Sequence, residues 1–105
     1  MVAQNDPSAP EFEWDTKKAK ENLKKHGITF EEALTVFADP LARIFDDPDH
    51  SANERRELVI GHSANQRMLV VSFTERESRT RIIGAREATP HERHDYEQNT
   101  SKRPT

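Results

Sequence analysis

The sequence of 105 residues contains no cysteine and little that is apolar. Without cysteine the protein can form neither disulfides nor a thiolate site, which suits a reducing compartment. Hydrophobic residues make up 32% of the chain and charged residues 33%, and no apolar run reaches the length of a membrane span or of a signal-peptide core. We therefore expect a cytoplasmic protein with one thin core and no membrane segment.

Charge of the two signs is unevenly distributed, although the formal net charge is only -3. Residues 1–50 carry 11 acidic and 6 basic side chains, and residues 51–105 carry 8 and 10. Five of the six lysines fall between Lys17 and Lys25, and nine of the ten arginines follow position 50. If folding brings these two groups together, they can meet a polyanion such as a nucleic acid. A solvated charged surface is the alternative.

Capping residues and prolines divide the chain into a domain and two tails. Residues 1–10 and 99–105 are polar and lack periodicity, so we expect flexible tails around a single domain at 11–98. Asp15 and Gly27 delimit a predicted helix at 16–26, and Thr29 begins a second helix that ends before Pro40.

The apolar period then changes from that of a helix to that of a strand. Strands are predicted at 41–45, 55–61, 67–74 and 79–86, and Thr89, Pro90 and Glu92 begin a last helix at 91–98. The order ααββββα predicts an α+β fold with the helices packed on one face of an antiparallel meander sheet.

Alternation along the predicted strands assigns side chains to the two sheet faces. The face toward the helices receives Leu58, Ile60, Leu69, Val71, Phe73 and Ile82. The other face, which no element is predicted to cover, receives Arg55, Glu57, Val59, Met68, Val70, Ser72, Arg79 and Arg81. Such a mixed apolar and cationic surface suits a bound partner or a nucleic acid. Arg67 and Arg86 share the alternation of the helix-covered face, at strand ends where a long side chain reaches the rim.

The clustered arginines allow two interpretations. The planar guanidinium matches phosphate geometry and can stabilise charge in a phosphoryl-transfer transition state. Alternatively, cross-strand ion pairs with Glu57, Glu75, Glu77 or Glu87 would make the arginines structural.

Several motifs occur together in the order found in one protein family. They are F-E-W-D at 12–15, K-H-G-I-T-F-E-E-A at 25–33, T-E-R at 74–76 and R-I-I-G-A-R-E-A-T at 81–89, followed by E-R and Tyr96. From Phe12 to Glu97 the chain resembles the BrnT type of toxin from bacterial type II toxin-antitoxin modules. The resemblance implies a RelE-like fold, cleavage of RNA without a metal or other cofactor, and neutralisation by a BrnA antitoxin that also binds the operator DNA. Gly84 stands where we expect the family more often to carry serine.

Cleavage of RNA without a metal requires a proton acceptor for the 2'-hydroxyl, a proton donor for the leaving oxygen and stabilisation of the phosphorane charge. His26 is the candidate proton carrier, although at a helix C-terminus it can simply interact with the dipole. Lys24 is a candidate phosphate contact or proton donor. Ribonucleases of the RelE type present basic residues on their sheet, so the resemblance adds Arg67, Arg81 and Arg86 to the catalytic set. For binding of RNA or of a partner we select Arg55, Arg79, Trp14 and Tyr96, with packing in the core as the alternative for the two aromatic residues.

The sequence is also compatible with two other functions. A non-catalytic binding module, whose basic sheet face docks an acidic partner or a nucleic acid, is compatible with the absence of a convincing acid/base pair. A metal-dependent hydrolase rests only on His91 and His94, one turn apart beside Glu92, with no third ligand close in the sequence.

Overall fold

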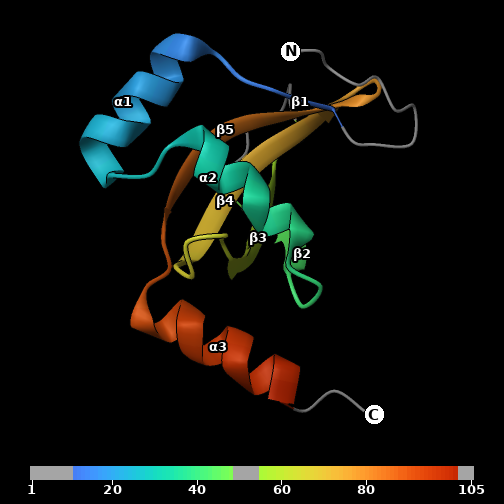
Figure 1. Ribbon diagram of the computed structural model, residues 1–105. Helices are drawn as coiled ribbons and strands as arrows, with labels where there is room; N and C mark the ends of the chain where they lie inside the picture. The colour runs from blue at the N-terminus through green and yellow to red at the C-terminus, as the bar shows by residue number, and fades with distance from the viewer. Residues whose placement is uncertain (1–10, 49–54, 102–105) are drawn as a thin grey trace.

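The protein combines a five-stranded sheet with three α-helices (Figure 1). The structure, a computed structural model, describes residues 11–48 and 55–101. In chain order the elements are β1 (Glu11–Glu13), α1 (Thr16–His26), α2 (Phe30–Thr35), the 3-10 helix η1 (Val36–Ala38), β2 (Arg43–Asp46), β3 (Glu57–His62), β4 (Met68–Arg76), β5 (Arg79–Glu87) and α3 (Pro90–Ser101). The helix α3 therefore continues into the segment predicted as a tail from residue 99. The tail predicted at 1–10 lies outside the described residues.

Side-chain caps explain where the helices begin and end. Asp15 accepts hydrogen bonds from the first backbone N–H groups of α1, and Gly27, with a φ of 72°, ends this helix in the left-handed conformation that glycine adopts without strain. Thr29 caps α2. Thr89 and Glu92 exchange hydrogen bonds of 2.9 and 3.2 Å at the start of α3. The caps predicted from the sequence are therefore confirmed.

The sheet is mixed, whereas the sequence predicted a purely antiparallel meander. Its strand order is β1-β5-β4-β3-β2. Strands β2 to β5 pair antiparallel as predicted, but β1 adds to β5 in parallel orientation. The sequence prediction missed β1 because its three residues, two of them glutamates, show no strand periodicity. Their pairing with Arg79 and Arg81 offsets this unfavourable composition.

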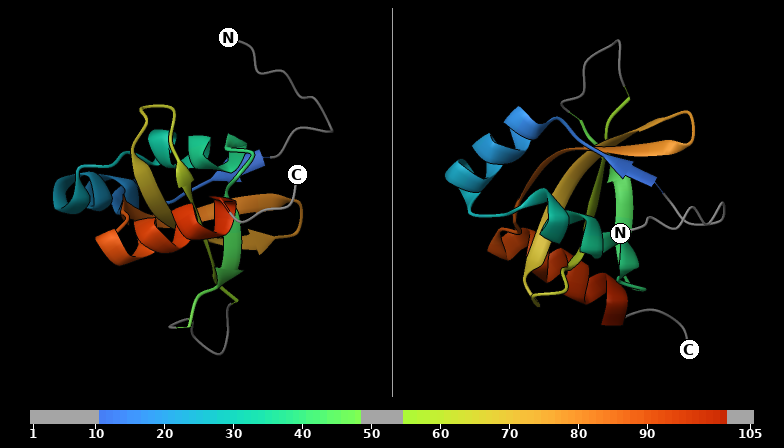
Figure 2. Two further views of the ribbon diagram at one scale, coloured as in Figure 1. Left: turned by 90° about the horizontal axis from the view of Figure 1, so that it is seen from below. Right: turned by 45° about the horizontal axis from the view of Figure 1, so that its top comes forward.

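Helices cover both faces of the sheet, so the prediction of one covered face is wrong. The helices α1 and α2 pack on one face, and α3 lies on the opposite face (Figure 2). Tyr96 of α3 belongs to a core cluster on that opposite face. The side chains beneath α1 and α2 include Val59, Leu69, Val71, Phe73 and Ile82. Ile60, Met68 and Val70 form a second core cluster with Tyr96. Met68 and Val70, predicted on an open face, are thus 2% and 3% exposed.

Strand β3 shows why alternation assigned its faces incorrectly. Val59 lies opposite Val71, and Ile60 lies opposite Val70. Val59 therefore faces α2 and Ile60 faces α3, the reverse of the prediction. A strand that is buried on both faces carries apolar residues at consecutive positions, so its sequence does not reveal which side faces which helix.

A bulge in β5 changes the position of an arginine in the predicted site. Ser72 lies opposite Gly84 and Phe73 opposite Ile82, so β5 carries one extra residue between them. Beyond this point the alternation is reversed. Arg86 lies opposite Val70 and therefore on the face that α3 covers, not on the face of α1 and α2 as simple alternation predicted.

Candidate functional site

An open pocket of about 500 Å³ lies where the C-terminal half of α1 meets β5 and the start of α3. We name it the α1–β5 pocket. Its polar lining comes from Asn22, His26, Asp47, Ser72, Arg86 and Glu92. Its apolar lining comes from Phe45, Pro48, Leu58 and Val70, and its backbone lining includes Gly84 and Ala85. Of the predicted catalytic residues, the pocket brings together His26 and Arg86.

Asn22 fixes α1 against β5 and so sets the position of His26. Its amide donates to the carbonyl oxygens of Ile28 and Ala85 at 3.0 and 2.9 Å, and its Oδ1 accepts from the Ala85 N–H at 3.1 Å. Asn22 thus takes the place of a neighbouring strand along a part of β5 that β1 does not reach. The sequence interpretation missed this residue. The available signal was a polar side chain one turn after Ala19 on the buried stripe of α1, because a buried amide must find hydrogen-bond partners.

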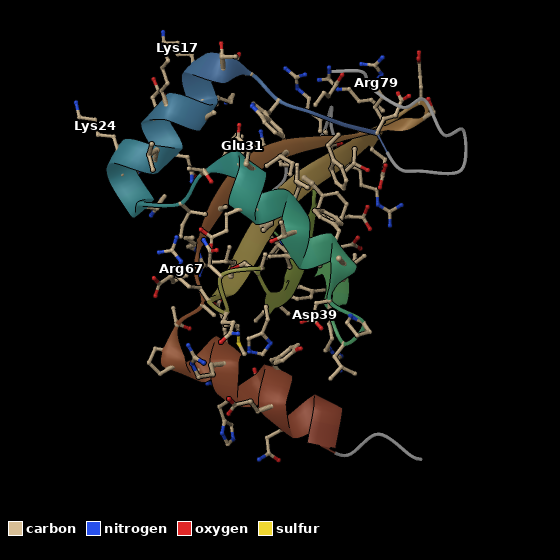
Figure 3. All side chains as sticks on the ribbon, in the orientation of Figure 1. Lys17, Lys24, Glu31, Asp39, Arg67 and Arg79 are labelled. Atoms are coloured by element: carbon tan, nitrogen blue, oxygen red, sulfur yellow. The ribbon has the colours of Figure 1, made fainter. Side chains whose placement is uncertain are left out.

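His26 lies one turn after Asn22, on the same side of α1, and its side chain is exposed at the pocket. Lys24 is also exposed but does not line the pocket. Figure 3 shows the side chains of Lys17 and Lys24 pointing from α1 away from the sheet. Histidine is the side chain that enzymes use most often for general acid–base catalysis.

Arg86 is held by Glu92 through a bidentate ion pair. Its Nη1 and Nη2 donate to the two carboxylate oxygens of Glu92 at 2.8 and 2.9 Å, and Nη1 also donates to the carbonyl oxygen of Glu87. The hydrogen bonds from Arg86 lower the pKa of Glu92 to about 2, against the opposing effect of burial. The same bonds raise the pKa of Arg86. The guanidinium is thereby fixed in one orientation at the pocket wall.

Arg67 lies outside this pocket, on the side of the sheet that α2 covers. Its Nε donates to Glu32 at 3.0 Å, and its Nη2 donates to Glu32 and to the carbonyl oxygen of Gly27. Ser63 donates to the same carboxylate at 2.7 Å. These bonds, those of Arg67 above all, lower the pKa of Glu32. Arg67 thus joins the β3–β4 turn to α2 and to the end of α1.

Arg79 and Arg81 lie at the other end of β5, beside β1. Arg81 Nη1 donates to Glu13 at 3.1 Å, and Arg79 pairs with Glu11 and Glu13 at 3.3 and 3.4 Å. The hydrogen bond from Arg81 lowers the pKa of Glu13. Figure 3 shows Arg67 and Arg79 at opposite ends of the sheet. The structure therefore does not bring the five predicted catalytic residues into one site. Of the ion-pair partners considered from the sequence, Glu87 lies 3.6 Å from Arg67, whereas Arg79 and Arg81 pair with Glu11 and Glu13 of β1.

The remaining predicted binding residues have clear structural contacts. Trp14 packs edge to face on Phe30, with ring centroids 5.9 Å apart. Tyr96 is 4% exposed and donates its hydroxyl to Asp39 at 2.9 Å. Burial, together with the Asp39 carboxylate, raises the pKa of Tyr96 to about 12. Arg55 is exposed and pairs with Asp46 at 3.2 Å.

Within 11–48 and 55–101, no group of three or more histidine, aspartate or glutamate side chains is arranged to hold a metal ion. His91, which the sequence offered as a ligand, pairs instead with Asp95 at 3.4 Å. None of the described helices is both long and apolar enough to span a membrane.

Comparison with known proteins gives a family and a similar fold. The sequence profile of the family described as "Ribonuclease toxin, BrnT, of type II toxin-antitoxin system" matches residues 14–92, from Trp14 to the first turn of α3. The crystal structure of the Brucella abortus ribonuclease toxin BrnT superposes with a TM-score of 0.60 at 24% sequence identity, over 77% of this chain and 99% of that one. No curated protein sequence matches.

Proposed function

Because the chain belongs to the BrnT family of ribonuclease toxins of type II toxin-antitoxin systems, we propose that it is a metal-independent endoribonuclease. Cleavage of cytoplasmic RNA then inhibits translation and growth. The observation that carries the active-site assignment is that His26 and Arg86, from elements far apart in the sequence, line one pocket. Relationship to ribonucleases of the RelE type is part of the same proposal.

The chemistry needs only groups of the RNA and of the protein. The 2'-hydroxyl loses its proton and attacks the adjacent phosphate, the 5'-oxygen leaves with a proton, and a 2',3'-cyclic phosphate forms. His26 is exposed at the pocket and is the proposed proton carrier. Nη1 and Nη2 of Arg86 each donate to the Glu92 carboxylate, and Nη1 also donates to the carbonyl oxygen of Glu87. A guanidinium has five N–H groups, so Arg86 keeps N–H donors for a phosphate oxygen.

Lys24, Arg67 and Arg81 lie outside the lining of the α1–β5 pocket, and we propose supporting roles for them. Lys24 adds positive charge beside His26. Arg67 holds the end of α1 through Gly27 and Glu32. Arg81 holds β1 on the sheet through Glu13.

The test is cleavage of bulk RNA by the purified full chain with a chelator present. His26→Ala is compared with His91→Ala, because His91 is an exposed histidine of α3 that does not line the pocket. We expect the wild type and His91→Ala to cut equally, and His26→Ala to lose about 10²-fold or more, the scale of a missing general acid or base. Intact RNA with folded wild-type protein contradicts the proposed activity.

Membership in a family of type II toxin-antitoxin toxins implies an antitoxin partner. We propose a BrnA-like protein that forms a hetero-oligomer with this chain and through which the complex binds operator DNA. Co-expression with a BrnA-like antitoxin should restore growth and allow a stable complex to be purified. Restored growth without a complex would point to another form of control.

One observation favours a non-catalytic binding module as the second candidate. Each arginine predicted to be catalytic already pairs with a carboxylate, namely Glu32, Glu13 or Glu92. Binding of RNA without cleavage by the wild type would establish that alternative.

A further inference from the structure

The α1–β5 pocket has two walls of different chemistry. His26 and Arg86 form a polar wall with Asn22, and Phe45 of β2 stands on an apolar wall with Leu58 and Val70. Phe45 is 45% exposed, in a protein whose other described phenylalanines are buried or half-buried. A large ring left open at the edge of a pocket is available for contact with a ligand.

The geometry of the edge strand explains why Phe45 faces the pocket. Phe45 lies opposite Leu58, which also lines the pocket, and so projects on that face of the sheet. Its neighbour Ile44 lies opposite Val59 and projects on the other face, with 56% of its surface exposed. The two adjacent side chains therefore have similar exposure, but only Phe45 reaches the pocket.

Charge determines the orientation of a ligand that combines a planar ring and an anion. Of the carboxylates that the structure describes, those of Glu92 and Asp47 line the pocket. Glu92 pairs with Arg86, and Asp47 follows Phe45 by two positions in the sequence. The helix α1 carries the exposed side chains of Lys24 and Lys25 beside His26, and no carboxylate of the described residues forms an ion pair with these lysines. These lysines favour an anionic group at the α1 end of the pocket, and the exposed ring of Phe45 favours an uncharged ring at the other end.

We infer that the pocket binds one unpaired nucleobase of single-stranded RNA, stacked on the ring of Phe45, with the adjacent phosphate beside His26 and Arg86. This inference rests on the proposed ribonuclease function and specifies its substrate.

Aromatic side chains stack on splayed-out bases of any sequence, whereas bases inside a duplex are not available. Gly84 and Ser72 both line the pocket, and a Cβ at position 84 would lie 3.2 Å from Ser72 Oγ. The amide of Asn22 is fully engaged with the backbone, so we assign it no contact with the base.

The experiment measures binding of a short single-stranded RNA with 2'-O-methyl groups throughout, which removes the nucleophile and prevents cleavage. A 2-aminopurine in the oligonucleotide reports stacking by its fluorescence, and anisotropy of an end label gives the affinity. Phe45→Ala should weaken binding by about 5- to 150-fold, the range for loss of one base–aromatic stack, and should abolish the 2-aminopurine signal. Phe45→Trp should retain both. Ile44→Ala is the matched control and should bind like the wild type.

Several results would overturn the inference. They are wild-type affinity of Phe45→Ala, equal binding of a duplex of the same length, and no detectable binding by the wild type. If Phe45→Ala does not fold, Phe45→Leu keeps the apolar surface of the edge strand without the aromatic face and should still lose the fluorescence signal. Parallel assays on unmodified RNA separate the two proposals. Normal cleavage by a folded Phe45→Ala protein with wild-type affinity refutes the stacking site alone, and stacking without cleavage refutes the ribonuclease assignment alone.

Discussion

The two ends of β5 present arginine in different surroundings. At the outer end, beside β1, Arg79 and Arg81 form ion pairs with Glu11 and Glu13. The pocket at this end is lined by two acidic and two basic residues, Glu13, Glu77, Arg76 and Arg79. At the inner end, Arg86 shares a pocket with an imidazole and an exposed aromatic ring. Both ends of β5 carry arginine, two residues at the outer end and one at the inner end. The neighbouring elements, rather than the arginines themselves, distinguish a structural ion-pair ladder from a candidate site.

Replacement of one arginine at each end of β5 has the largest expected effect and tests whether the two ends differ in function. Arg86→Ala should reduce single-turnover cleavage by ~10² to 10³-fold, the scale of losing one preorganised charge-stabilising donor. Arg81→Ala should leave the rate nearly unchanged, because its guanidinium pairs with Glu13 outside the α1–β5 pocket. Arg86→Lys should restore only part of the rate, because an ammonium cannot reproduce the planar fork.

Thermal midpoints of the same variants provide the control. If Arg86→Ala loses activity only in proportion to its unfolded fraction, Arg86 is structural. If both alanine variants lose equal activity while folded, Arg81 belongs to the site and the distinction between the two ends is wrong.

Asn22→Ala tests what joins α1 to the inner end. The substitution leaves buried backbone groups of Ala85 and Ile28 without their partner, so we expect the free energy of unfolding to fall by about 2 to 3 kcal/mol. Glu21→Ala, at an exposed position of the same helix, should change it by less than about 0.5 kcal/mol. Denaturant unfolding measures both. Equal stability of the two variants would show that water replaces the amide of Asn22 without loss.

The ion pair between Arg86 and Glu92 gives a pH-dependent test of the inner end. The pKa of Glu92 is about 2 in the folded protein, below its ordinary value of 4.5. Its contribution to stability is therefore complete above about pH 4.5 and is lost as the pH falls toward 2. Glu92→Gln preserves the capping geometry at Thr89 and should lower the free energy of unfolding at pH 7 by about 2 kcal/mol, after allowance for solvent screening.

Unfolding of the wild type and Glu92→Gln across this pH range measures the effect. The difference between the two proteins should shrink steadily below pH 4.5. Glu31→Gln, at an exposed position of α2, is the matched control for removal of a carboxylate. A difference that stays constant from pH 7 to pH 2.5 would mean that the ion pair does not stabilise the folded state.

Local patterns predicted much of the fold but little of the contact between its parts. The caps at Asp15, Thr29 and Thr89 and the antiparallel order of the last four strands follow from neighbouring residues, and the structure confirms them. The parallel strand β1 depends on Arg79 and Arg81, some 68 positions later in the chain, so no local signal identified it.

The site was harder to predict for a related reason. The motif around His26 and the sequence around Arg86 indicated two residues that line the pocket. The bulge before Gly84, the acidic partners of the arginines and the hydrogen bonds of the Asn22 amide all depend on tertiary pairing. Phe45 was missed because one aromatic residue in a short apolar strand is more typical of a core.

Tyr96→Phe should produce the smallest of these effects and tests how α3 is held at the inner end. The variant keeps the ring among Ile60, Met68 and Val70 but loses the hydroxyl that donates to Asp39. Asp39 still accepts hydrogen bonds from the backbone N–H groups of His62 and Leu41, so its carboxylate stays satisfied. We therefore expect the free energy of unfolding to fall by about 1 kcal/mol.

Hydrogen exchange should accelerate in α3 more than in β1, because only the contact of α3 is weakened. Cleavage should be nearly unchanged, since Tyr96 does not line the α1–β5 pocket. A tenfold loss of cleavage at normal stability would return Tyr96 to the RNA-binding residues, as the sequence first predicted, and would extend the site along α3.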